Sequence, residues 1–255
     1  MLLSLLLSSA LAAPAPVSEG LHALFMRSAT QARLPVLGDR PGASEAWVLV
    51  ELTQAGSGTA SAVRTPCSVR MLGAGERAHV RLGPGFLEAM GARSTTWHFT
   101  PEQTGWSVET DLGVDHVGYD PEATGGVLPR HAEAPGVVDH ESDGNPGATV
   151  IVDVPLLGEQ EIYIAQRAHQ SLHGRLSEDG MMEGGIEGHA LDQQTLDATN
   201  ALMKLSPEMR PDPARSAWWM VPVPADTDCA SLASRACAIR GAGLGCPDGL
   251  AEAGP

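Results

Sequence analysis

Apolar and polar residues alternate in short stretches along most of the chain. The clearest stretch runs from Thr95–Thr100 to Trp106–Thr110, and Pro101–Gly105 lies between the two halves. Trp97 and Phe99 alternate there with polar neighbours. A period of two places alternate side chains on one face of a strand, so this stretch predicts a β-hairpin. Further strands are expected at Ala46–Thr53, Cys67–Leu72, Ala78–Leu82, Thr149–Val154, Glu161–Leu176, Met181–Ala190 and Trp218–Val223.

Short strands at steady spacing, with few helices between them, are typical of an antiparallel all-β domain. We expect a β-barrel or a closed two-sheet sandwich, lipocalin-like in outline, with one or two short helices. A helical turn is expected at Phe86–Met90 and short helices at Leu21–Arg27 and Asp228–Ile239. The stretch Leu191–Leu205 fits either a helix or a bent strand.

Composition and motifs divide the chain into four segments. Residues 1–12 have the features of a signal peptide, because the apolar run Leu2–Leu11 ends in the cleavage pattern Ala10-Leu11-Ala12. Residues 13–43 are rich in Pro, Ala and Gly, residues 44–225 hold the expected β-domain, and residues 226–255 contain three of the four cysteines. We therefore expect a periplasmic or secreted protein with no transmembrane segment.

The charge of the chain excludes two classes of partner. Its 16 Lys and Arg stand against 31 Asp and Glu, which gives a formal net charge of −15. With Lys204 as its one lysine, it offers no basic patch for nucleic acid or for anionic lipid. Its 43% hydrophobic content argues against disorder, and 29 Gly and 19 Pro argue against a helix bundle.

The four cysteines predict two disulfides, because an even count is typical of exported proteins. Cys237 and Cys246 bracket a glycine-rich loop that closes easily, which leaves Cys67 with Cys229. The other two connectivities remain open at this point. The spacings match no zinc pattern, so metal ligation is disfavoured.

The segment from residue 139 to residue 147 resembles the start of a calcium loop. Asp139, Glu141 and Asp143 occupy positions 1, 3 and 5, Gly144 occupies position 6, and the carbonyl of Asn145 would take position 7. An EF-hand has a bidentate Glu at position 12, where this chain has a valine, so another carboxylate must complete any Ca²⁺ site. The alternative is a solvated acidic turn. The candidates for the additional carboxylate are Asp111, Asp115, Asp120 and Asp153.

The same region carries a resemblance to a known group of proteins. From the Trp97 hairpin through Gly147 and Ala148–Val150, the chain resembles uncharacterised exported proteins of gliding, predatory bacteria. These proteins carry a D-x-D-x-D-G-x-P-G segment before a β-branched strand, and here Glu141 replaces the middle Asp. The resemblance extends faintly to Glu161–Arg167 and Asp228–Ala230. It implies an exported, β-rich envelope protein and brings no activity.

Two other groups of residues are candidates for chemistry. His169 and His173 share a face of the expected strand but lie about 13 Å apart, which is too far for both to bind one ion. His189 on the returning strand is a conceivable third ligand. We nevertheless expect surface histidines, because zinc sites need ligands set close together. Trp218 and Trp219 should point to opposite faces of their strand. The pair is either one core residue and one rim residue, or an aromatic contact for a ligand or partner.

These patterns favour an exported cell-envelope β-domain with a structural or binding role, stabilised by Ca²⁺ and without evident enzymatic activity. One alternative is a lipocalin-like carrier of a small apolar ligand, which a cavity lined by Trp47, Trp97 and Trp106 would favour. The other is a hydrolase without a recognisable motif, which a Ser, His and Asp set in one cleft would favour. The expected partner is an envelope protein or that apolar ligand.

Overall fold

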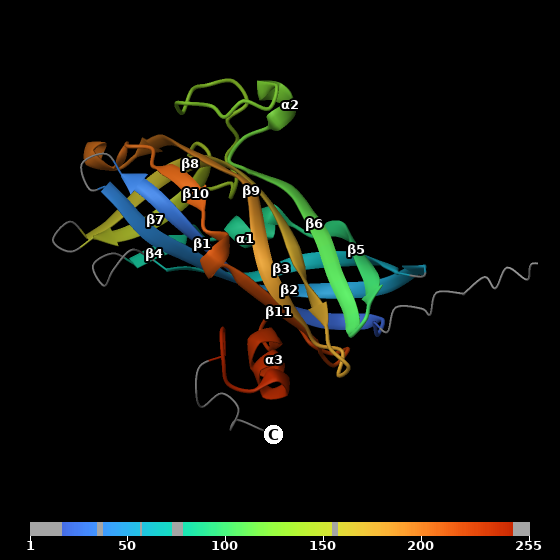
Figure 1. Cartoon of the computed structure of the whole chain (residues 1–255). Coiled ribbons are helices and arrows are strands. Elements are labelled where there is room, and N and C mark those ends of the chain that lie inside the picture. The colour runs from blue at the N-terminus through green and yellow to red at the C-terminus, as the bar shows by residue number, and fades with distance from the viewer. Residues whose placement is uncertain (1–16, 35–37, 57, 73–78, 155–157, 247–255) are drawn as a thin grey trace, which may run out of the picture.

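The computed structural model describes residues 17–34, 38–56, 58–72, 79–154 and 158–246, and antiparallel strands dominate it (Figure 1). The strands are β1 Gly20–Leu34, β2 Gly38–Gly56, β3 Thr59–Leu72, β4 His79–Leu82, β5 Arg93–Glu102, β6 Gly105–Val117, β7 Ala148–Val154, β8 Gly158–Leu176, β9 Met182–Ala198, β10 Glu208–Pro211 and β11 Ala217–Pro222. The helices are α1 Phe86–Met90, α2 Pro121–Thr124 and α3 Leu232–Arg240, with 3₁₀ turns at Ala201–Met203 and Pro213–Arg215.

Eight of the strands close into a ring. Their order is β8-β6-β5-β3-β2-β1-β11-β9, and β9 pairs again with β8. Strand β7 pairs with the first residues of β8, on the edge opposite β9, and β4 pairs with β7. Strand β10 pairs with β1. Every pairing between strands is antiparallel. The expected all-β class, with the outline of a barrel or closed sandwich and short helices, is confirmed.

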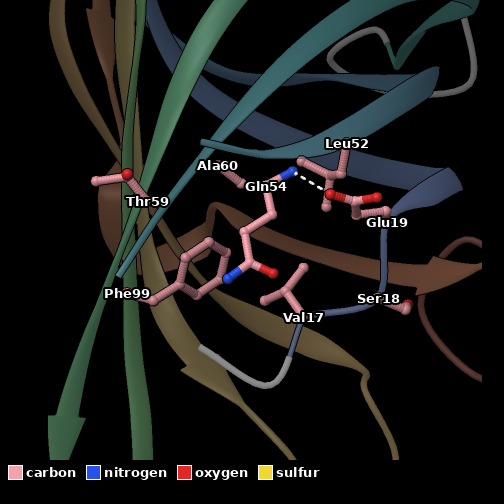
Figure 2. Close-up of a pocket in the computed structure, with 8 residues that line it drawn as sticks. All are labelled: Val17, Ser18, Glu19, Leu52, Gln54, Thr59, Ala60 and Phe99. Atoms are coloured by element: carbon pink, nitrogen blue, oxygen red, sulfur yellow. Dashed lines mark hydrogen bonds between the residues drawn. The ribbon is translucent and has the colours of Figure 1, made fainter. Parts of the chain in front are cut away.

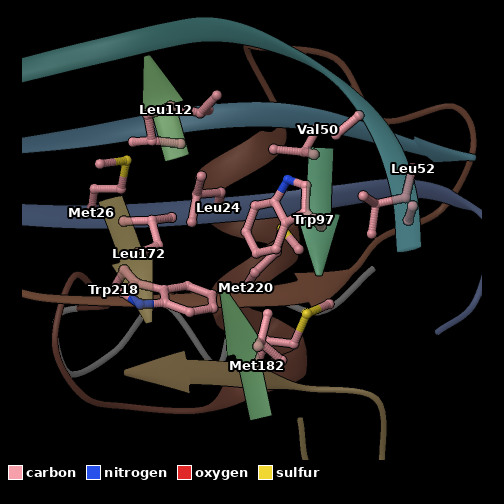
Figure 3. Close-up of a cluster of buried hydrophobic side chains, with 14 of the residues drawn as sticks. Leu24, Met26, Val50, Leu52, Trp97, Leu112, Leu172, Met182, Trp218 and Met220 are labelled. Atoms are coloured by element: carbon pink, nitrogen blue, oxygen red, sulfur yellow. The ribbon is translucent and has the colours of Figure 1, made fainter. Parts of the chain in front are cut away.

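The interior of the ring is packed with apolar side chains (Figure 3). Trp97 of β5 and Trp218 of β11 meet edge to face across it, with ring centroids 5.6 Å apart. Leu24, Leu172 and Met182 are completely buried beside them. Because burial of such side chains contributes roughly 1.5–3 kcal/mol each, this core supplies much of the driving force for closure.

A second core lies outside the ring, where the C-terminal segment covers β1, β2 and β11. Phe25, Trp47 and Trp219 form an aromatic cluster with centroids 5.2–5.6 Å apart. Leu232 and Ala236 of α3 are fully buried against this cluster. In Figure 1 the helix lies against the lower side of the ring. Residues 226–246 are therefore part of the folded unit.

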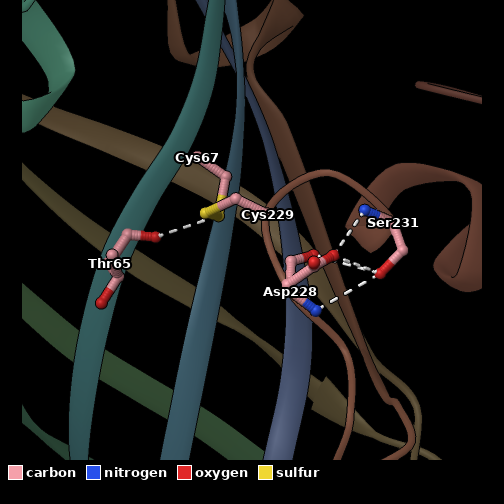
Figure 4. Close-up of a disulfide and its surroundings, with 5 residues drawn as sticks. All are labelled: Thr65, Cys67, Asp228, Cys229 and Ser231. Carbon is pink, nitrogen blue, oxygen red and sulfur yellow. Dashed lines mark hydrogen bonds between the residues drawn. A yellow bond between two sulfur atoms is a disulfide. The ribbon is translucent and has the colours of Figure 1, made fainter.

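Both expected disulfides are present. Cys67 of β3 is bonded to Cys229 (Figure 4), and Cys237 is bonded to Cys246. Beside Cys229, the carboxylate of Asp228 accepts hydrogen bonds from the N–H and hydroxyl of Ser231, which starts the turn into α3. One disulfide thus ties the C-terminal segment to the ring, and the other closes its end.

Three expectations about the N-terminal part need correction or lie outside the described residues. The expected helix at Leu21–Arg27 is wrong, because these residues belong to β1 between β2 and β11. The ring therefore begins at Gly20, well before the expected domain boundary at residue 44. The expected signal peptide, residues 1–12, lies outside the described residues. None of the helices in the described part of the chain is long and apolar enough to cross a membrane.

Candidate metal site

The acidic segment lies at the end of the long connection between β6 and β7, which also carries α2 and extends above the ring in Figure 1. The segment closes on itself through backbone hydrogen bonds. The N–H of His140 donates to the carbonyl of Gly147 at 2.9 Å, and the N–H of Gly147 donates to Val138 at 3.0 Å. Gly147 is required there, because it has a φ of 83° and an added Cβ would lie 2.5 Å from the carbonyl oxygen of Ile164.

The three acidic residues predicted from the sequence converge. Asp139, Glu141 and Asp143 each offer one carboxylate oxygen, and these oxygens all lie within 4.8 Å of one another. Asp139 holds the turn, because its carboxylate accepts the N–H of Asp143 at 3.0 Å and that of Gly144 at 2.7 Å. A carboxylate has about four lone-pair sites, so each oxygen of Asp139 keeps acceptor capacity for a cation.

Thr149 of β7, which no sequence pattern marked as a site residue, holds the carboxylates of the other two acids. Its N–H donates to Oε1 of Glu141 at 2.9 Å, and its hydroxyl donates to Oδ2 of Asp143 at 2.7 Å. Thr149 is only 2% exposed. The acidic residues are therefore attached to the sheet, which a simple solvated turn does not require. The signal that could have found Thr149 is its position two residues after the acidic segment, at the start of the β-branched strand.

Glu141 is the most constrained of the three acids. Burial raises its pKa, the N–H of Thr149 opposes that shift, and repulsion from Asp143 and Asp139 adds to it. Its Oε1 accepts the bond from Thr149, whereas its Oε2 is buried without a hydrogen-bond partner in the described structure. A Cβ added at Gly83 would approach Oε1 of Glu141 at 3.5 Å, so the turn before α1 covers this carboxylate closely.

The pKa of Asp143 is shifted in the opposite direction from that of Glu141. Burial by itself would raise its pKa, but the hydrogen bonds from Thr149 and Asn145 outweigh that effect and lower it. Three arginines of the sheet form ion pairs with carboxylates outside the cluster. Arg81 lies against Glu159, Arg93 against Asp115 and Arg167 against Asp192. A bound cation would offset the repulsion among the three carboxylates and satisfy the free oxygen of Glu141.

The remaining predicted ligands are placed differently. The N–H of Asn145 donates to Oδ1 of Asp143 at 2.8 Å, so Asn145 lies next to the cluster. Among the described residues the cluster consists of Asp139, Glu141 and Asp143, and none of the four candidates for the additional carboxylate belongs to it. Asp111 bonds Gly113 and His169, Asp115 pairs with Arg64 and Arg93, Asp120 caps α2, and Asp153 is an exposed residue of β7.

The tryptophan pair is not an accessible contact surface. Trp218 and Trp219 do point to opposite faces of β11, as expected, but both are 1% exposed. The nitrogen Nε1 of Trp218 donates to the carbonyl of His173 at 3.1 Å, and that of Trp219 donates to Leu244 at 2.8 Å. The expected rim position is wrong, because the C-terminal segment covers the outer ring. The expectation of a ligand or partner contact at this pair is also wrong, because both tryptophans are core residues.

The expectations for a carrier cavity also differ from the structure. Trp97 and Trp106 contribute to the core inside the ring, whereas Trp47 packs outside it, so the three indoles line no common cavity. At the mouth of the ring, Val17, Gln54 and Phe99 surround a pocket of about 10 Å³ (Figure 2), which is enough for about one water molecule.

Comparison with protein-family models, with curated proteins and with solved structures gives no match for this chain.

Proposed function

We propose that this protein is an exported cell-envelope β-domain with a structural or binding role, and that its acidic loop binds one Ca²⁺ ion. The observation that carries the calcium proposal is the convergence of Asp139, Glu141 and Asp143, anchored by Thr149. The ion would hold the connection between β6 and β7 against the ring.

The donor set favours calcium over a transition metal. All the donors are oxygens, which suit hard cations, and Ca²⁺ accepts six to eight of them in flexible geometry. Asp139, Glu141 and Asp143 supply carboxylates, the carbonyl of Asn145 would follow as in calcium loops, and water would complete the shell. The exposed side of the cluster, at Asp139 and Asp143, leaves room for that water.

The disulfides support the compartment. All four cysteines are paired, and one bond joins residues 162 positions apart in the chain. Disulfides of this kind persist in oxidising compartments, which is compatible with an extracytoplasmic protein. Together with the signal-peptide pattern and the resemblance to exported envelope proteins, this supports a periplasmic or secreted location.

The calcium proposal is tested by calorimetric titration and thermal unfolding of the mature chain, with equal ionic strength of NaCl as the reference. We expect one Ca²⁺ per chain. At a calcium concentration of 100 Kd, the free energy of unfolding should rise by about 2.7 kcal/mol. Asp143→Asn, which keeps an oxygen acceptor, should weaken Ca²⁺ binding by about tenfold or more, equivalent to about 1.4 kcal/mol.

The matched control is Glu133→Gln, which removes one negative charge from the same connection. Its side chain is 88% exposed and lies outside the cluster, so Ca²⁺ binding should be unchanged. Equal losses in both variants would indicate general charge attraction. A wild-type chain that neither takes up Ca²⁺ nor gains stability from it would contradict the proposal.

Export is tested separately, by mass spectrometry of the protein isolated from its own host. A chain that begins near Ala13 and is four protons lighter than the reduced form would support export with both disulfides formed. A chain that retains residues 1–12 and four thiols would contradict it.

A further inference from the structure

Four polar side chains meet on the outer face of the ring, far along the chain from the acidic loop. Nε2 of His169 on β8 lies 2.8 Å from Oδ1 of Asp111 on β6. The rings of His169 and His189, which is on β9, are 4.7 Å apart between centroids. Nε2 of His189 lies 2.8 Å from the hydroxyl of Ser171. Three adjacent strands thus bring two imidazoles and one carboxylate together.

Two irregularities in the sheet lie at this cluster. In β9, His169 pairs with Ala190 and Gln170 pairs with Gly188, so His189 is an extra residue in a β-bulge. In β6, the register shifts between Asp111 and Val114 at the same level of β8. Bulges re-aim side chains and are common next to functional sites. If the pairing of Gln170 with Gly188 continued without the bulge, His189 would lie directly opposite His169, so the bulge re-aims His189 rather than bringing it to this level of β8.

The orientation of β8 is fixed from the opposite side. Gln170 points into the ring, where its Oε1 accepts a hydrogen bond from Ser28 of β1 at 3.3 Å. Successive side chains of a strand alternate between faces, so His169 and Ser171 must point outward together. The backbone under the cluster is therefore held by packing, while the side chains remain near solvent.

The arrangement does not fit nucleophilic catalysis. In a Ser-His-Asp set, one histidine bonds both the serine and the carboxylate. Here Ser171 bonds His189, whereas Asp111 bonds His169. The carboxylate therefore does not orient the histidine that would take the proton from the serine. This cluster therefore gives no specific support to the hydrolase alternative.

The donor set fits a metal ion of a different class from that of the acidic loop. We propose that Asp111, His169 and His189 form a binding site for a divalent transition metal such as Zn²⁺. Two imidazole nitrogens and one carboxylate oxygen are ligands that Zn²⁺ prefers, and a fourth position would face solvent. The N–H of Gly113 donates to Asp111 at 2.7 Å and orients this carboxylate from behind.

Binding requires His189 to move, because in the structure Asp111, His169 and His189 do not yet bring one ligand atom each within 4.8 Å of one another. Nε2 of His169 and Oδ1 of Asp111 are already 2.8 Å apart, and a metal ion would replace the proton that they share. His189 is exposed, so its ring can leave the hydroxyl of Ser171 and turn toward the ion. The ion would then join β6, β8 and β9 on the outer face of the ring.

The experiment is a titration of the mature chain with Co²⁺ and then Zn²⁺, with Ca²⁺ in excess to occupy the acidic loop. Co²⁺ should produce the visible absorption of a site with nitrogen and oxygen ligands at one ion per chain, and Zn²⁺ should displace it. His169→Gln and His189→Gln should each weaken Zn²⁺ binding by about tenfold or more, because even residues behind metal ligands have effects of about that size.

The controls separate this site from others. His173→Gln removes an exposed imidazole from the same face of β8, and Asp143→Asn alters the acidic loop, so both should bind Zn²⁺ like the wild type. Near-UV circular dichroism checks that each variant is folded. The proposal is overturned if the wild type binds no Zn²⁺, if the His169→Gln/His189→Gln double variant binds it unchanged, or if His173→Gln weakens binding equally.

Discussion

The hydroxyl of Thr149 donates a hydrogen bond to Oδ2 of Asp143 at 2.7 Å, and this contact joins the acidic loop to the start of strand β7, which follows it. Thr149 is the second residue of β7 and pairs with Tyr163 of β8. A single buried residue thus belongs to both the sheet and the candidate metal site. Loss of its hydroxyl should therefore affect both stability and ion binding.

Thr149→Val removes this hydroxyl but keeps the β-branched shape and the N–H that bonds Glu141. Hydrogen bonds to charged groups contribute about 1.5–3 kcal/mol, so we expect a loss of about that size in urea unfolding, together with weaker Ca²⁺ binding. Thr110→Val is the matched control, because the buried hydroxyl of Thr110 bonds only the carbonyl of Thr96. That variant should lose stability and keep Ca²⁺ binding. Unchanged Ca²⁺ affinity in Thr149→Val would contradict the expectation.

Trp219→Phe should loosen the C-terminal segment from the ring. The change removes the hydrogen bond to the carbonyl of Leu244 and weakens the cation–π contact with the Arg240 guanidinium, which lies 4.7 Å from the centroid of the indole ring. We expect a loss of about 1–3 kcal/mol in urea unfolding, from the unpaired carbonyl and the weaker cation–π contact. Faster hydrogen exchange confined to α3 would locate the effect, whereas an increase confined to the ring interior would not fit.

The two disulfides should differ in their contribution to stability. Cys67–Cys229 closes a loop with a sequence separation of 162, whereas Cys237–Cys246 has a separation of 9. The chain-entropy model gives roughly 5 kcal/mol for the long loop and roughly 3 kcal/mol for the short one. Unfolding of the paired Cys→Ser variants measures both values. A larger loss from the short loop would show that strain or residual structure outweighs chain entropy.

Stability should fall in mildly acidic solution because of His22. This residue is 1% exposed, and burial lowers its pKa below the ordinary 6.5, although the carbonyl of Gly20 opposes the shift. The folded protein therefore keeps His22 neutral at pH values where the unfolded chain takes up a proton. The contribution of neutral His22 to the free energy of unfolding is complete above pH 6.5. It is lost as the pH falls from 6.5 toward the lowered pKa of the folded state.

Urea unfolding at several pH values between about 7.5 and 5 tests this prediction, with a slope of up to about 1.4 kcal/mol per pH unit from one group. His22→Gln should reduce the slope, because glutamine does not titrate. The exposed His98 provides the control, and His98→Gln should leave the slope as in the wild type. Equal slopes in wild type and His22→Gln would rule out His22 as the cause.

Local patterns determined a large part of the fold. The alternation around Trp97 and Phe99 identified the β5–β6 hairpin, and both side chains are buried while His98 is exposed. The acidic positions 1, 3 and 5 identified three side chains that converge, because a short loop with glycines leaves them few other arrangements. The cysteine spacing identified the favoured pairing, since a nine-residue separation closes easily.

The tertiary structure decided what depends on contacts distant in sequence. β1 resembled a helix because both of its faces are buried, with Leu24 inside the ring and Phe25 under the C-terminal segment, so apolar residues run without alternation. Because the C-terminal segment also covers Trp219, this residue belongs to the core and not to the expected rim. Asp111, His169 and His189 meet because β6 and β9 flank β8 in one particular register, and register between strands distant in sequence is set by packing of the whole ring.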